Sequence, residues 1–250
     1  MQGVFSMTCG CGDESSVKSR RSAIGGVMGM GLAAASIPFV TGSESRAEAR
    51  TLLESPTPDE ALAALMAGNE RYIKGNMIPD DHVSTRARLV DGQAPHAIIL
   101  RCADSRVSPE IVFDQGLGEI FVCGVAGNIP TPDIVASMEF AVAVLGSGLI
   151  VVMGHSSCGA VDAAVKHIDS VESLPGSLPG LVSQILPAAI ETKDSSGDRL
   201  QNAIAANVVN GMQRLPKMSE ILKDGQDAGT LKIVGGVYDL KSGRFNLVEG

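Results

Sequence analysis

The stretch "HAIILRCADSR", residues 96–106, sets both the fold and the chemistry of this chain. Its first half is a brief apolar run, which is typical of a strand buried on both faces of a parallel sheet. Its second half adds a thiol, a carboxylate and a guanidinium at Cys102, Asp104 and Arg106. In parallel α/β sheets, functional groups gather just past the carboxyl ends of the strands. Taken alone, the stretch fits either a metal site at that edge or an ordinary strand end followed by a solvated ion pair.

The rest of the chain repeats this pattern of short strands separated by helices. Thr57-Pro58-Asp59-Glu60 predicts a helix start, with Thr as the N-cap, Pro at the first helical position and Glu closing a capping box. Thr131-Pro132-Asp133 predicts a second start of the same kind. Further strands are expected at 119–126, 148–154 and 231–240, a closing hairpin through 241–243, and helices at 85–90, 158–168 and within 181–223, after a loop at 169–180. Strands alternating with helices predict one α/β domain, whose central, mostly parallel β-sheet is flanked by helices.

Composition limits the class of partner. The 250 residues are enough for one good-sized domain, and 44% of them are hydrophobic while only 3% are aromatic, so the core must be aliphatic. The formal net charge of −8 argues against a nucleic-acid partner, which would need a basic face. It does not exclude a small anion, because one local arginine can hold an anion whatever the total charge.

The first fifty residues have the pattern of an export signal. Arg20 and Arg21 precede an apolar, Gly/Ala-rich run at 23–40, and Ala47-Glu48-Ala49 follows as a small-x-small cleavage site. We expect residues 1–49 to be a twin-arginine signal peptide, residues 50–250 to be the mature domain, and the location to be periplasmic or otherwise extracytoplasmic. An uncleaved membrane anchor is the alternative. The glycines of the run and the cleavage site favour cleavage, which would leave no stable membrane span in the mature form.

A second motif supplies partners for Cys102. "GHSSCGAV", residues 154–161, follows an expected strand, and the two residues between His155 and Cys158 let a turn aim both side chains at one point. Alone, Cys102 would be a small buried hydrophobe and His155 an interior histidine. Two sulfurs and one nitrogen at the ends of two strands instead predict a zinc site, with the open fourth position of a catalytic centre. Cys123, inside an expected strand, is assigned to the core, and the few remaining cysteines do not form a disulfide framework.

These two motifs carry a family resemblance. "CADSRVSPEIVFDQGLGEIFVCGVAGN", residues 102–128, followed by "GHSSCGAV", resembles the signature pair of β-class carbonic anhydrases. The likeness runs from "TPDEALAALMAGNERY" at 57–72 through "GGVYDLKSGRFNL" at 235–247. It implies the β-carbonic-anhydrase fold and a zinc lyase, carbonate dehydratase, that hydrates carbon dioxide reversibly to bicarbonate and a proton. It also implies one Zn2+ per chain, held by residues beside a catalytic dyad of Asp104 and Arg106; the zinc ligands are Cys102, His155 and Cys158.

The resemblance leaves two states open for Asp104. Its carboxylate either pairs with Arg106, which keeps the fourth zinc position open, or swings to ligate zinc itself. Four further residues match the positions that bind substrate in the family: Gln93, Phe121, Phe140 and Gly159. Gln93 would orient the substrate, the two Phe rings would line an apolar pocket, and Gly159 would offer its backbone N–H.

One residue departs from the family pattern. Gly124 stands where an arginine is common, and in some members that arginine helps to hold a non-catalytic bicarbonate. The effect of Gly124 on such a site, and on the subunit contact, is left open. The family assembles as dimers or multiples of dimers, so a homodimer or higher homo-oligomer is expected, its size undecided. The alternatives are a carbon disulfide or carbonyl sulfide hydrolase on the same scaffold, and an inactive, zinc-stabilised protein that binds bicarbonate.

Overall fold

The computed structural model describes residues 56–249 of the chain. The expected signal peptide, residues 1–49, lies outside the described residues. Among the helices of the described range, none combines the length and the apolar character that crossing a bilayer requires.

The strands of this range form one sheet in the order β2-β1-β3-β4-β5. Their bounds are β1 Ala97–Arg101, β2 Ile120–Gly124, β3 Leu149–His155, β4 Lys232–Tyr238 and β5 Phe245–Leu247. The first four run parallel, and β5 pairs antiparallel with β4 as the second arm of the predicted hairpin. The mostly parallel sheet predicted from the sequence is therefore confirmed, with strand ends displaced by one or two residues.

Helices surround this sheet. Their bounds are α1 Pro58–Ile73, α2 His82–Arg88, α3 Pro109–Val112, α4 Pro132–Ala143, α5 Gly159–Lys166, α6 Leu178–Val182, α7 Leu186–Glu191, α8 Arg199–Met218 and α9 Glu220–Asp227, with 3-10 turns η2 Ala126–Asn128 and η3 Val171–Ser173. The loop predicted at 169–180 contains a short 3-10 turn, η3, and the first residues of α6, so it is in part helical.

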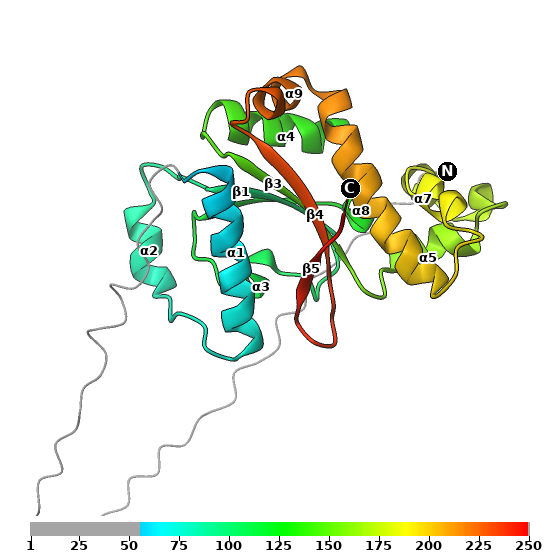
Figure 1. The fold of residues 1–250 in the computed structure, drawn as a ribbon, viewed down its shortest axis with the longest axis horizontal. Coiled ribbons are helices and arrows are strands. Elements are labelled where there is room, and N and C mark those ends of the chain that lie inside the picture. Colours follow the sequence, from blue (N-terminus) through cyan, green and yellow to red (C-terminus); the bar gives the residue numbers. More distant parts are fainter. Residues whose placement is uncertain (1–55, 250) are drawn as a thin grey trace, which may run out of the picture. The chain divides into compact units, whose positions relative to one another are not determined.

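The two central strands are buried on both faces, which explains their unbroken apolar sequence. Side chains alternate along a strand, so Ile99 of β1 belongs to one core cluster with Leu65 of α1, whereas Ile98 belongs to another with Val208 of α8. Figure 1 shows α1 and α8 on opposite sides of the sheet. The sheet is thus covered on both faces, as parallel sheets require.

The helix starts follow local capping chemistry. In α1 the predicted capping box forms, with the Thr57 hydroxyl accepting from the Glu60 N–H and the Thr57 N–H donating to the Glu60 carboxylate. Helix α2 begins three residues earlier than predicted, because the carboxylate of Asp81 caps it. Thr131 occupies the N-cap of α4 but makes no side-chain cap hydrogen bond, so Pro132 sets that start.

The strand order brings the two sequence motifs together. Strands β1 and β3 are neighbours, with Arg101 opposite Met153 at their carboxyl ends. Cys102 follows the first of these residues, and His155 ends β3. Segments about fifty residues apart in the chain therefore meet at one edge of the sheet.

Candidate metal centre

Three buried side chains converge at this edge. The ligand atoms of Cys102, His155 and Cys158 all lie within 4.8 Å of one another. The two Sγ atoms are 3.9 Å apart. A tetrahedral zinc with Zn–S bonds of about 2.3 Å would hold two sulfurs about 3.8 Å apart. The spacing of the sulfurs therefore already suits such an ion.

The backbone between His155 and Cys158 produces this convergence. His155 ends β3, and Ser157 adopts a left-handed conformation with φ of 57°, which turns the chain sharply. Cys158 is the N-cap of α5 and makes no side-chain cap hydrogen bond, although the backbone amides of Val161 and Ala160 act to lower the pKa of its thiol. Amides at a helix start favour a thiolate over a thiol, so this end of α5 supports metal ligation.

The imidazole of His155 is fully buried and oriented by one hydrogen bond. Its Nδ1 lies 2.9 Å from the carbonyl oxygen of Ser156, so we assign the proton to Nδ1. Its Nε2 then carries the lone pair, and it finds no hydrogen-bond partner among the described residues. A buried polar atom without a partner is costly, and a metal ion between this nitrogen and the two sulfurs would satisfy it.

The two sulfurs differ in their proton affinity. The hydrogen bond from the Cys158 thiol lowers the pKa of Cys102 to about 4, helped by the Gly127 N–H, which donates to Cys102 Sγ at 3.3 Å. The same contact with Cys102, together with burial, raises the pKa of Cys158. Burial opposes a charged imidazole, but the neighbouring Cys102 thiolate outweighs it and raises the pKa of His155. Metal binding would release the proton held between the two sulfurs. A donor set of two sulfurs and one nitrogen fits zinc.

Gly127 is required for this arrangement. Its φ of 74° is unfavourable for other residues, and a Cβ there would lie 2.5 Å from Cδ1 of Ile185. The Asn207 side chain donates to the Gly127 carbonyl at 2.8 Å, which anchors the residue whose N–H donates to Cys102 Sγ.

Asp104 and Arg106 form a bidentate pair beside the three ligands. Arg106 donates from Nε to one carboxylate oxygen at 2.9 Å and from Nη2 to the other at 2.7 Å. The Arg106 side chain holds the pKa of Asp104 well below its usual range. The second oxygen, Asp104 Oδ2, is 3.9 Å from His155 Nε2. Of the two states left open by the sequence, this structure has the one in which Asp104 is paired.

The candidate substrate residues are more dispersed. Gln93 is exposed in the loop before β1, and Gly159 is the first residue of α5. Phe121, in β2, packs in the core cluster that contains Cys123, and Phe140 is 49% exposed on α4. Besides Gly159, which directly follows Cys158, the structure brings five of the predicted residues together at the sheet edge: Cys102, Asp104, Arg106, His155 and Cys158.

Sequence reasoning missed the residue that fills the space beside Gly124. Arg101 of β1 lies directly opposite Gly124 of β2, and a Cβ on Gly124 would come within 3.4 Å of the Arg101 guanidinium. Arg101 Nη1 donates to the carbonyl oxygen of Cys102 at 2.8 Å. The Arg101 guanidinium thus lies in contact with the point from which a side chain at 124 would start. Only the strand register reveals this pairing.

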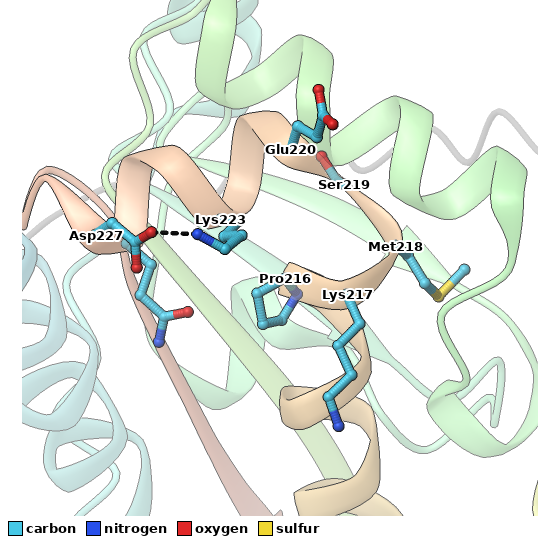
Figure 2. A pocket seen from close by; sticks show the side chains of 8 residues that line it. Pro216, Lys217, Met218, Ser219, Glu220, Lys223 and Asp227 are labelled. Carbon is cyan, nitrogen blue, oxygen red and sulfur yellow. Dashed lines mark hydrogen bonds and ion pairs between the residues drawn. The ribbon is translucent and has the colours of Figure 1, made fainter.

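A separate hollow lies at the corner between α8 and α9. Figure 2 shows Lys223 turned towards Asp227, with which it forms an ion pair. The pocket has a volume of about 630 Å³ and is lined by Pro216, Lys217, Met218, Ser219, Glu220, Lys223, Gln226 and Asp227. None of these residues belongs to the three-ligand cluster, so the metal-binding chemistry lies elsewhere.

Known proteins resemble this chain in both sequence and fold. A family model described as carbonic anhydrase matches residues 97–245, a range that contains the whole cluster. The carbonic anhydrase of Mycolicibacterium smegmatis is 37% identical over 196 residues, which is 78% of this chain and 95% of that protein. Carbonic anhydrase 2 of Mycobacterium tuberculosis is 38% identical over 198 residues, which is 77% of this chain and 93% of that protein.

Solved structures agree on the architecture. A structure from a study of two tetrameric β-carbonic anhydrases of Sordaria macrospora aligns with a TM-score of 0.60 and 23% identity, covering 77% of this chain and 96% of the other. At that identity the likeness shows a shared fold. The family model and the sequence identity over nearly the whole length of the relatives lead, together with this fold, to one conclusion. The chain belongs to the carbonic anhydrase family of enzymes, and it has the fold of the β-carbonic anhydrases.

Proposed function

We propose that this protein is a zinc enzyme that hydrates carbon dioxide reversibly to bicarbonate and a proton. The observation that carries the proposal is the buried cluster, in which two sulfurs 3.9 Å apart face an imidazole nitrogen with no partner among the described residues. Cys102, His155 and Cys158 would hold one zinc per chain. Zinc in such a site lowers the pKa of water towards neutrality and so supplies a hydroxide nucleophile.

Asp104 would orient that nucleophile. Because Arg106 keeps the pKa of Asp104 low, its carboxylate is ionised at neutral pH and can only accept hydrogen bonds. Arg106 also uses both carboxylate oxygens, which holds Asp104 beside the metal ligands instead of among them. If the pair broke, Asp104 would be free to ligate zinc and close the site, more so at low pH where less hydroxide competes.

The substrate pocket would be completed by a second copy of the chain. Carbon dioxide is apolar, so a pocket of aromatic rings with one polar group at Gln93 suits it. Phe140 on α4 and Val144, the C-cap residue that follows this helix, are 49% and 65% exposed, a degree of exposure that favours contact with another subunit. We therefore propose a homo-oligomer, in which Phe121 and Phe140 line the pocket together with residues from the neighbouring subunit, and Gly159 offers its N–H to the substrate.

Export of the enzyme is part of the proposal. Its support is the sequence of residues 1–49, with paired arginines, an apolar run and a cleavage site. Replacing both Arg20 and Arg21 by Lys should retain the protein in the bacterial cytoplasm, whereas the parent chain should appear, shortened, in the periplasmic fraction. A parent chain that stays in the cytoplasm would contradict export, and a full-length chain in the membrane fraction would favour the anchor.

The enzymatic proposal is tested on protein that begins at Arg50. We expect one zinc per chain by elemental analysis, and carbon dioxide hydration well above the buffer rate. Parallel assays with carbon disulfide and carbonyl sulfide distinguish the rival hydrolase on the same scaffold. Zinc-loaded protein that hydrates nothing would leave the inactive bicarbonate-binding protein as the better interpretation.

A further inference from the structure

Every polar group of Ser156, the residue after the His155 ligand, is hydrogen-bonded. Its N–H donates to the Tyr238 carbonyl at 2.9 Å, and its own carbonyl accepts from His155 Nδ1 at 2.9 Å. Its hydroxyl oxygen accepts from the Leu240 N–H at 2.9 Å, and the hydroxyl donates to Asp239 Oδ1 at 3.3 Å. These bonds hold Ser156 in place, and with it the carbonyl that contacts the imidazole of His155.

The carboxylate of Asp239 connects this serine to the β4–β5 turn. Its Oδ1 also accepts from the Lys241 N–H at 3.3 Å. Its Oδ2 accepts from the Ser242 N–H at 3.1 Å and from the Ser242 hydroxyl at 2.6 Å. The backbone of Asp239 closes the turn, since its N–H donates to the Arg244 carbonyl at 2.8 Å. One side chain therefore serves two structures, the turn and the loop that follows the metal ligand.

The β4–β5 turn is also anchored to helix α1. Asn69, which is 1% exposed, donates to the Gly243 carbonyl at 2.8 Å and accepts from the Phe245 N–H at 2.9 Å. The hydroxyl groups of Tyr72 and Tyr238 lie 3.2 Å apart. A continuous set of contacts thus runs from α1 through the turn to Asp239, Ser156 and the imidazole.

We propose that Ser156 and Asp239 are positioning residues of the metal centre. They hold the Ser156 carbonyl where it selects the Nδ1-protonated form of His155, which leaves Nε2 directed at the two sulfurs. This inference rests on the metal site of the proposed function. Groups that orient a ligating histidine from behind typically contribute about 10–100-fold to metal affinity, because they fix both the ring and its tautomer. Neither residue is a catalytic residue, since both act through His155.

The test uses variants of the protein that begins at Arg50, with zinc affinity measured by competition against a chromophoric chelator. Ser156→Ala and Asp239→Asn should each weaken zinc binding about 10–100-fold and shift the visible bands of the cobalt-substituted protein. Ser156→Thr keeps the hydroxyl and should keep the parental affinity. The matched control is Ser242→Ala, which removes the shortest turn contact of the same carboxylate but no contact to Ser156. It should leave zinc affinity unchanged.

The outcomes separate positioning from turn stability. Thermal unfolding of each metal-free variant shows whether it folds. The positioning role is wrong if Ser242→Ala lowers the zinc affinity as much as Ser156→Ala and Asp239→Asn do. It is also wrong if Ser156→Ala keeps the parental zinc affinity and cobalt spectrum. A parent that binds no zinc would overturn this inference and the proposed function together. A parent that binds zinc without hydrating carbon dioxide would overturn the reaction alone, since the affinity series still decides this inference.

Discussion

At the scale of single residues, Asp104 has the most clearly defined contacts beside the cluster. Its carboxylate is held at both oxygens by Arg106 and lies 3.9 Å from the imidazole that faces the sulfurs. It is not one of the three side chains whose ligand atoms lie within 4.8 Å of one another. A change at this position should therefore separate chemistry from metal binding.

We expect Asp104→Asn to keep zinc and lose turnover. The amide has the shape of the carboxylate, but it carries no charge and presents a donor where the proposed nucleophile needs an acceptor. The turnover number should fall about 10²–10⁴-fold, the range for a positioned acid–base group. Stopped-flow hydration assays together with zinc analysis check this. Loss of zinc alongside turnover would instead show that Asp104 helps to build the metal site.

Arg101 and Gly124 form a second pair of single residues, joined only through the strand register. We expect Gly124→Arg to destabilise the protein by about 1–3 kcal/mol, because its side chain would meet the guanidinium of Arg101 at close range and with like charge. The double variant R101G/G124R should recover most of this loss. Denaturant unfolding of the zinc-loaded proteins measures both. Strictly additive effects would mean that the two positions do not share this space.

At the scale of elements, local signals predicted where helices and strands begin more reliably than what they touch. The capping box at Thr57 and Glu60 is a contact within one turn, so its letters were sufficient. The start of α2 was mistaken because the helix predicted at 85–90 did not take account of Asp81 as an N-cap. The close approach of α1 to the segment after α3 could not be predicted, since it joins residues more than forty positions apart.

That approach occurs at Gly68, and it reverses the usual effect of alanine in a helix. A Cβ on Gly68 would lie only 1.7 Å from the carbonyl oxygen of Phe113, a backbone atom that cannot move aside cheaply. We expect Gly68→Ala to lower the free energy of unfolding by about 1–3 kcal/mol or more. The same substitution at a helical glycine without such a contact would raise it by about 1 kcal/mol. The control, Ala67→Gly at an exposed neighbour, should lose about 1 kcal/mol. Chemical denaturation of the two variants measures these free energies. A Gly68→Ala variant more stable than the parent would contradict the close contact with Phe113.

At the scale of the whole molecule, the site depends on the order of the strands. Cys102 and His155 could each be predicted to stand at a strand end, and the motif spacing predicted that His155 and Cys158 act together. Their meeting with Cys102 requires β1 to lie beside β3, which the strand order confirms. The support behind the imidazole, from Ser156 and Asp239, escaped prediction because it depends on the pairing of β3 with β4.

A metal that joins these separate segments should stabilise the native chain as a whole. Zinc bound by the folded protein and not by the unfolded chain adds about 4 kcal/mol when its free concentration is a thousand times the dissociation constant. We therefore expect removal of zinc by a chelator to lower the unfolding midpoint, and added zinc to restore it. Cys158→Ser removes one of the two sulfurs, so its midpoint should respond much less to free zinc. A parent whose midpoint is the same with and without zinc would show that the three ligands do not hold the ion in the folded state, and that the ends of β1 and β3 are joined by strand pairing and packing without the metal.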